Sequence, residues 1–130
     1  MANLTDHAEK LLLDYLMTAE VVTRPTAWYL ALFTAAPSDA GGGAEVSGAG
    51  YARQPIAFTA AATPAGSTAN NASITFTASG GDFGSVSHIA IFDAEVGGNA
   101  LWTGALGAAR TVNNGDNLTF GIGAVNTSLA

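Results

Sequence analysis

Apolar residues occupy both alternating positions of one segment near the start of the chain, residues 26–35. The apolar residues are Trp28, Leu30 and Leu32 on one face and Ala27, Tyr29, Ala31 and Phe33 on the other. Successive side chains of a strand point to opposite faces, so a strand with one wet face would alternate apolar and polar residues. The pattern therefore predicts a central strand that is covered on both sides.

A second apolar pattern, at helical spacing, precedes this strand. The stripe consists of Ala8, Leu11, Leu12, Tyr15, Leu16 and Ala19. This spacing predicts one N-terminal helix over residues 5–20, capped by Thr5 or Asp6, whose Leu11, Leu12 and Tyr15 cover one side of the sheet. Leu13 and Met17 lie outside the stripe. They are either the edge of a wide buried face or a contact patch for a neighbouring subunit.

From residue 26 onward, turn residues recur between short β-prone runs, which is typical of a sandwich or barrel. The predicted strands are 28–35, 53–60, 73–79, 85–93, 100–106, 109–112, 117–122 and 125–129. Residues 94–99 read as a hairpin loop, and Asn113–Asp116 as a type I′ turn. The fold prediction is a single domain over residues 1–130. It consists of the N-terminal α-helix and a mainly β, antiparallel, jelly-roll-like β-sandwich over residues 26–130.

The predicted core contains the large apolar residues of these strands. They are Trp28, Leu30, Leu32, Ile74, Phe76, Ile89, Ile91, Phe92, Leu118 and Phe120. Residues 36–50, rich in Gly, Ala and Ser, should form a long surface loop.

Loops of this length are usually either functional or disordered, so two interpretations of residues 36–50 stay open. One is a mobile tether. The other is a contact element, with interface residues Asp39, Glu45, Val46, Tyr51 and Arg53. In that case Arg53 would meet a carboxylate of a neighbouring subunit, and Val46 would bury a little apolar area there.

The amino-acid composition restricts the kinds of partner that the protein can bind. Only 11% of the 130 residues are charged, and the net charge is −6. A surface so low in charge favours self-association, and we expect a homo-oligomer. Four basic residues are too few for a nucleic-acid partner. No apolar run has membrane-spanning length and no signal peptide is evident, so we expect synthesis in a cytoplasm without a membrane partner.

No pattern indicates catalysis, a metal or a cofactor. The chain has no cysteine and two histidines, His7 and His88. We expect His88 to be half-buried in a strand and His7 to be solvated. A triad of Ser87, His88 and Asp93 fails because neighbouring strand residues should face opposite ways.

A calcium site made from scattered loop carboxylates is a weaker alternative. The residues concerned are Asp39, Glu45, Asp93, Glu95, Asn113 and Asp116. They lack the dense spacing of a helix-loop-helix calcium loop. The prediction is a protein with no enzymatic activity and no bound metal or cofactor.

Several blocks of sequence carry a family resemblance. They are TAWYLALFTAAP at 26–37, DAGGGAEVSG at 39–48, GYARQP at 50–55, ITFTA at 74–78, VSHIAIFDA at 86–94, GGNALWTGAL at 97–106 and TVNNGD at 111–116. Together they resemble a family of small tailed-phage virion proteins usually labelled phage tail fibre proteins. The resemblance implies a structural virion component, made in the bacterial host cytoplasm, with no catalytic residues.

At 130 residues the chain is too short for a long fibre. We therefore expect an oligomeric base or adaptor for a spike or fibre on the head or tail, with other capsid, tail or fibre proteins as partners. One alternative is a carbohydrate-binding receptor-recognition module, with Trp102, Tyr51 or Trp28 as stacking platforms. Another is a capsid decoration protein.

Overall fold

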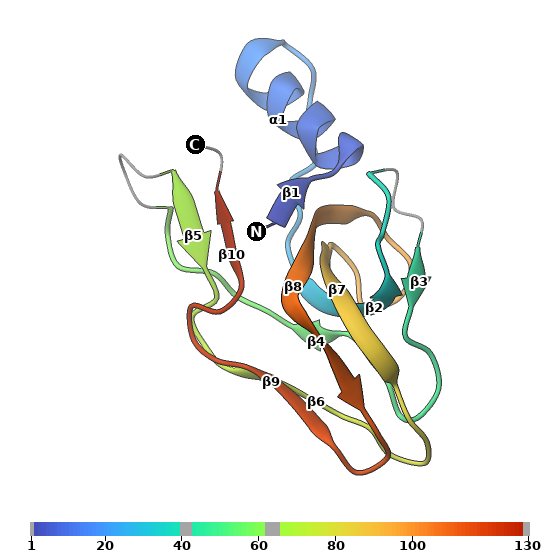
Figure 1. The fold of residues 1–130 in the computed structure, drawn as a ribbon. Helices are drawn as coiled ribbons and strands as arrows, with labels where there is room; N and C mark the ends of the chain where they lie inside the picture. The colour runs from blue at the N-terminus through green and yellow to red at the C-terminus, as the bar shows by residue number, and fades with distance from the viewer. Residues whose placement is uncertain (1, 40–42, 62–65, 129–130) are drawn as a thin grey trace.

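The computed structural model describes residues 2–39, 43–61 and 66–128. Within these ranges the fold is mainly β, with antiparallel sheets and the single helix α1 (Asp6–Met17) (Figure 1). The strands are β1 (Ala2–Leu4), β2 (Tyr29–Ala35), β3 (Ala44–Glu45), β4 (Gln54–Pro55), β5 (Ser67–Ala69), β6 (Ile74–Thr77), β7 (Gly84–Phe92), β8 (Ala100–Val112), β9 (Asn117–Phe120) and β10 (Asn126–Ser128). The predicted β-sandwich with one N-terminal helix is confirmed.

One large sheet organises the domain. Its order is β1-β8-β7-β2-β3, and β4 pairs with the same edge of β2 as β3 does. Two smaller antiparallel pairs, β6 with β9 and β5 with β10, complete the fold. The helix follows β1 at one edge of the large sheet, and β3 forms the opposite edge.

The main core lies between the large sheet and the β6–β9 pair. Ile74 and Phe76 of β6 are buried, whereas Thr75 and Thr77, which alternate with them, are exposed. The same alternation in β9 buries Leu118 and Phe120. They pack with Leu30 and Leu32 of β2, both fully buried. Trp28 and Ile89 are half-buried against this core, and the other members of the predicted core are buried.

A second, smaller cluster covers the other face of the large sheet. It consists of Ala31, Phe33, Ala90, Phe92 and Ala100. The rings of Phe33 and Phe92 stack with their centroids 6.3 Å apart. Strand β2 is therefore covered on both faces, as its doubly apolar pattern predicts.

Three predicted strands differ clearly in extent from those observed. The segment 53–60 pairs regularly only at β4 and then through a single bridge at Phe58. Residues 100–112, predicted as two strands, form one strand with an irregular register, in which Val86 pairs with Arg110 but His88 pairs with Ala105. At the predicted break, residues 107–108, the strand continues, but its pairing register shifts opposite Ser87. The short strands β1, β3 and β5 lie outside the predicted strands, and residue 129 of the last predicted strand lies outside the described residues.

The turn at Asn113–Asp116 is not type I′. The Asp116 amide donates to the Asn113 carbonyl at 2.8 Å. Gly115 has a φ of +88°, but Asn114 is not among the described residues with positive φ, which a type I′ turn requires. Strand β8 pairs with β7 and β1, whereas β9 pairs with β6. The turn therefore carries the chain between two sheets instead of closing a hairpin.

Helix α1 is fixed to the sheet at its first turn. Thr5 caps it by accepting from the Ala8 amide at 3.3 Å, and its hydroxyl donates to the Ala100 carbonyl at 2.6 Å. Ala8 is the buried residue of the helix. The expectation that Tyr15 covers the sheet is wrong, since this side chain is 73% exposed. With its anchor at the N-terminal end, the helix projects from the sheet (Figure 1).

Candidate assembly surfaces

Glu45, Tyr51 and Arg53 form a hydrogen-bonded network at the β3 edge of the sheet. The Arg53 guanidinium donates from Nε to Glu45 Oε2 and from Nη2 to Glu45 Oε1, each at 2.8 Å. The Tyr51 hydroxyl donates to Glu45 Oε2 at 2.7 Å and accepts from the Leu32 amide at 3.0 Å. We call these three residues the Arg53 network. Its paired donors match the fork geometry in which Arg binds a carboxylate most strongly.

The network also fixes the loop between β7 and β8. Arg53 Nη1 donates to the carbonyls of Ala94 and Gly97 at 2.9 and 2.7 Å. The guanidinium carbon lies 3.6 Å from the centroid of the Phe92 ring, a cation–π contact. One arginine therefore joins strand β3, the apolar cluster on the second face and the 93–99 loop.

The pKa shifts of the network indicate a structural role. Burial alone would raise the pKa of the Glu45 carboxyl, but hydrogen bonds from Arg53 and Tyr51 and the charge of Arg53 together lower it. The hydrogen bond to Glu45 raises the pKa of Arg53, and burial raises the pKa of the Tyr51 phenol. At neutral pH the acid and the base are both charged and are bonded to each other.

The predicted contact role of the 36–50 loop needs correction in two details. Val46 is buried in the main core, with 5% exposure, and its amide donates to the Leu32 carbonyl. Arg53 pairs with Glu45 of its own chain instead of a neighbour's carboxylate. Asp39 is exposed, and its carbonyl accepts from the Asp6 amide at the start of α1. Residues 40–42 of this loop lie outside the described residues.

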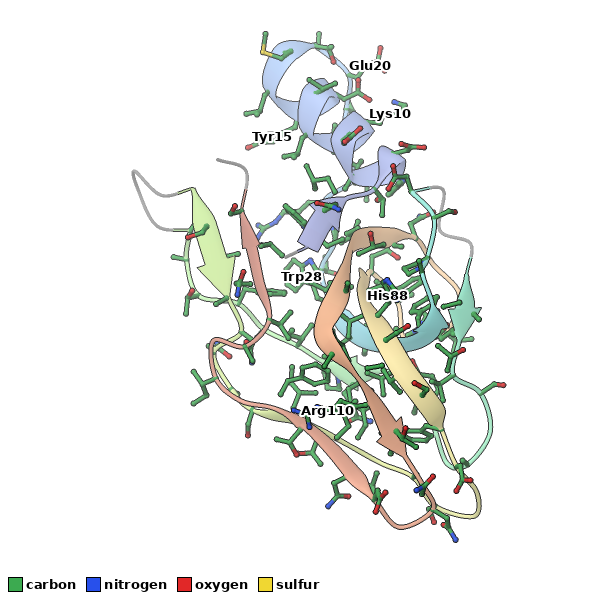
Figure 2. All side chains as sticks on the ribbon, viewed as in Figure 1. Lys10, Tyr15, Glu20, Trp28, His88 and Arg110 are labelled. Carbon is green, nitrogen blue, oxygen red and sulfur yellow. The ribbon has the colours of Figure 1, made fainter. Side chains whose placement is uncertain are left out.

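Helix α1 differs from the buried residues of this loop, because several of its apolar side chains are exposed. Leu13 and Met17, one helical turn apart, are 61% and 76% exposed. Tyr15, Leu16 and, beyond the helix, Val21 are also exposed. Figure 2 shows Tyr15 at the side of the helix. Exposed apolar residues that gather in this way mark interaction sites, whereas isolated ones do not.

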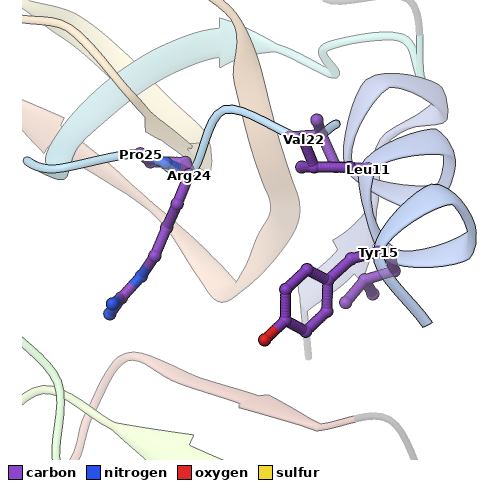
Figure 3. Close-up of a pocket in the computed structure, with 6 residues that line it drawn as sticks. Leu11, Tyr15, Val22, Arg24 and Pro25 are labelled. Atoms are coloured by element: carbon purple, nitrogen blue, oxygen red, sulfur yellow. The ribbon is translucent and has the colours of Figure 1, made fainter. Parts of the chain in front are cut away.

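A groove lies between the helix and the segment that follows it. Its volume is about 340 Å³, and its lining consists of Leu11, Leu12, Tyr15, Val22, Arg24 and Pro25. Figure 3 shows the Tyr15 ring and the Arg24 side chain extending on the same side, one from the helix and one from the following segment. The groove is apolar at its base and has one cation at its rim.

His88 and two of the acidic residues considered for chemistry, Asp93 and Asp116, have local hydrogen-bond partners. Contrary to expectation, Ser87 Oγ and His88 Nδ1 lie 2.8 Å apart, because the register irregularity at this point breaks the strict alternation of side chains. Asp93 accepts from the Asn99 amide, and Asp116 from the Asn113 amide. Within the described ranges no three His, Asp or Glu side chains gather as metal ligands.

The proposed glycan platform Trp102 is half-buried and packs against the main core. Tyr51, the second aromatic considered, belongs to the Arg53 network. Trp28, the third, is also half-buried against the core.

Comparison with known proteins identifies one family. The sequence model described as Podophage GP4 fiber I protein gp80 matches residues 3–128, a range that contains α1 and every strand from β2 to β10. A search of curated proteins finds no match. No helix in the part of the chain that the structure describes is long and apolar enough to cross a membrane.

Proposed function

The chain belongs to the Podophage GP4 fiber I protein gp80 family, and from this premise we propose that it is an oligomeric base or adaptor to which a spike or fibre attaches on a tailed-phage particle. Membership in this family makes it a structural phage protein, as the sequence motifs predict. The proposal adds a non-enzymatic role as a connector between other virion proteins on the head or tail.

The observation that carries the proposal is the exposed apolar surface of helix α1. A helix of 12 residues is marginal on its own, and most of its stability in a protein comes from packing of its apolar face. In the isolated chain Ala8 is the buried residue of α1, Leu11 and Leu12 are half-buried, and the apolar residues from Leu13 to Met17 are exposed. A partner that covers the remaining turns would supply the missing packing, which supports α1 as an attachment element.

The two apolar faces of the helix suit a connector. Leu11, Leu12 and Tyr15 face the groove, whereas Leu13 and Met17 lie on the outward face. We propose that the spike, fibre or capsid partner binds to the outward face. Asp39 lies close to the start of the helix and belongs to the same proposed surface, while Glu45, Val46, Tyr51 and Arg53 hold the loop that carries it. With a net charge of −6, a protein partner fits better than a nucleic acid or an anionic membrane.

The test uses phage particles that carry the double variant Leu13→Glu, Met17→Glu. Both side chains are exposed in the free chain, so the fold should tolerate the change. We expect purified variant particles to lose the attached spike or fibre protein, measured by mass spectrometry and electron microscopy. Ile122→Glu is the control, since Ile122 is 74% exposed but lies in the turn between β9 and β10.

Two results would overturn the proposal. One is a variant particle with a full complement of spike or fibre protein. The other is a wild-type chain that sediments only as a 13.0 kDa monomer at micromolar concentration, because a base of this kind must self-associate.

A further inference from the structure

The loop between β7 and β8 presents an exposed tip of two residues, Glu95 and Val96. Val96 is 87% exposed, and Glu95 is exposed beside it. The tip therefore projects one apolar side chain and one negatively charged side chain next to each other.

Hydrogen bonds on both sides preform this tip. Arg53 holds the carbonyls of Ala94 and Gly97, and Asp93 Oδ1 accepts from the Asn99 amide at 2.7 Å. Gly98 has a φ of +72°, and a Cβ there would lie 2.5 Å from Asp93 Oδ1, so the tight backbone requires glycine. A preformed tip loses little conformational freedom when it binds.

The groove beside helix α1 complements the tip in shape and charge. Its volume of about 340 Å³ is lined mainly by apolar side chains, with the Arg24 guanidinium at the rim (Figure 3). The ion pairs among the described residues are Lys10–Asp14 and Glu45–Arg53, which leaves Arg24 and Glu95 without an ionic partner there. The groove thus offers an apolar base and a positive rim, and the tip an apolar side chain and a negative one.

We propose that the Glu95–Val96 tip of one copy of this chain enters the groove of a second copy. Val96 packs among Leu11, Leu12 and Tyr15, and Glu95 pairs with Arg24. The inference rests on the proposed oligomeric function and names the surfaces through which the copies meet.

The positions of the two elements specify the kind of assembly. The tip is held against β3 through Glu45 and Arg53, whereas the groove adjoins the helix that follows β1, at the opposite edge of the sheet. The tip and the groove are thus two different surfaces, and each copy can offer its groove to one neighbour and its tip to another. Such a head-to-tail contact produces a ring when the rotation closes. A ring is a suitable base for a central or peripheral spike.

Charge reversal tests this contact in the full-length chain. Arg24→Glu and Glu95→Arg each place like charges together, and we expect each to weaken self-association about tenfold or more in sedimentation velocity. The double variant restores an opposite pair and should recover most of the wild-type affinity. Val96→Ser should also weaken assembly. All of these side chains are exposed, so circular dichroism should show an unchanged fold.

Two exposed residues away from the contact serve as matched controls, Arg110→Glu for charge and Ile122→Ser for apolar area, and both should assemble like wild type. If wild type assembles but the single reversals do so equally well, or the double reversal shows no recovery, the tip-in-groove contact is wrong and the proposed function stands. If wild type remains a monomer at all concentrations, both are wrong.

Discussion

Helix α1 and segment 43–53 flank the same sheet, but they are attached to it in opposite ways. In segment 43–53, Val46 enters the main core and the side chain of Arg53 is only 8% exposed between Glu45 and two backbone carbonyls. In α1 the buried residue is Ala8 in the first turn, and Met17 at the end of the helix is 76% exposed. The segment with little regular structure is the better anchored of the two.

This difference follows from where the backbone N–H and C=O groups of each segment find their hydrogen-bond partners. The helix makes its backbone hydrogen bonds internally, so its backbone needs no polar partners on the sheet, and packing of its apolar face can come from another protein. Segment 43–53 contains only a two-residue strand, and its polar groups must find partners elsewhere in the fold. A helix is therefore suited to carry an apolar face away from the body, and a loop of this kind is suited to hold neighbouring loops in place.

The largest expected effect comes from Arg53→Ala. The change removes both bonds to Glu45, two bonds to carbonyls and the contact with Phe92. Breaking a buried pair costs about 3–5 kcal/mol, and because the Glu45 side chain is 26% exposed we expect roughly 3 kcal/mol. Denaturant unfolding measures the loss. Arg110→Ala, at an exposed position, should change stability by less than about 0.5 kcal/mol, and an equal loss in the two variants would refute the role of the network.

A pair of identical substitutions compares the two regions directly. Val46→Ala removes buried methyl groups and should cost about 1–2 kcal/mol. Val21→Ala, just beyond the helix, changes a side chain that is 96% exposed and should cost less than about 0.5 kcal/mol in the unassembled chain. Equal costs in thermal unfolding would show that the two regions are not anchored differently.

Acid should weaken the Arg53 network by protonating Glu45, whereas Leu13 and Met17 on the outward helix face carry no titratable group. The pKa of Glu45 is lower in the folded chain than its ordinary value of 4.5. Its contribution to stability is therefore present above that value and is lost as pH falls through the folded pKa. We expect Glu45→Gln to be less stable than wild type at pH 7 and to show a shallower loss of stability below pH 4.5. Parallel curves for the two proteins would contradict this.

Substitutions on the outward helix face should have the smallest effect on the free energy of unfolding. Leu13→Gln and Met17→Gln should each change the unfolding free energy of the unassembled chain by less than about 0.5 kcal/mol, since both side chains are exposed. A loss above about 2 kcal/mol in either variant would mean that the helix packs on its own sheet.

The parts of the fold that sequence predicts best are those with local alternation. Ile74 and Phe76 alternate with threonines, and the strand and its buried face follow directly. Helical spacing likewise identifies which residues of α1 share a face, but it does not specify what covers that face. For this reason the spacing predicts that Tyr15 covers one side of the sheet, although its side chain is exposed.

The Arg53 network could not be predicted because its members meet through tertiary structure. Glu45 and Arg53 lie eight residues apart across a glycine-containing loop, and the carbonyls of the 93–99 loop come from a distant part of the chain. One signal was available. In a chain with so few charges, an acid and an arginine on the two sides of a short loop are strong candidates to pair with each other. The contact between Ser87 and His88 had no such signal, since it depends on a register irregularity.

Oxidation of Met17 tests the central claim, that the helix carries an assembly surface, most directly. Met17 is 76% exposed in the single chain, and an accessible thioether is readily converted to the sulfoxide. Mass spectrometry after brief peroxide treatment gives its oxidation rate in dilute, unassembled protein and in intact particles. We predict rapid oxidation in the dilute chain and a severalfold slower rate in particles. An equal rate in both would show that nothing covers the outward face and would contradict the account.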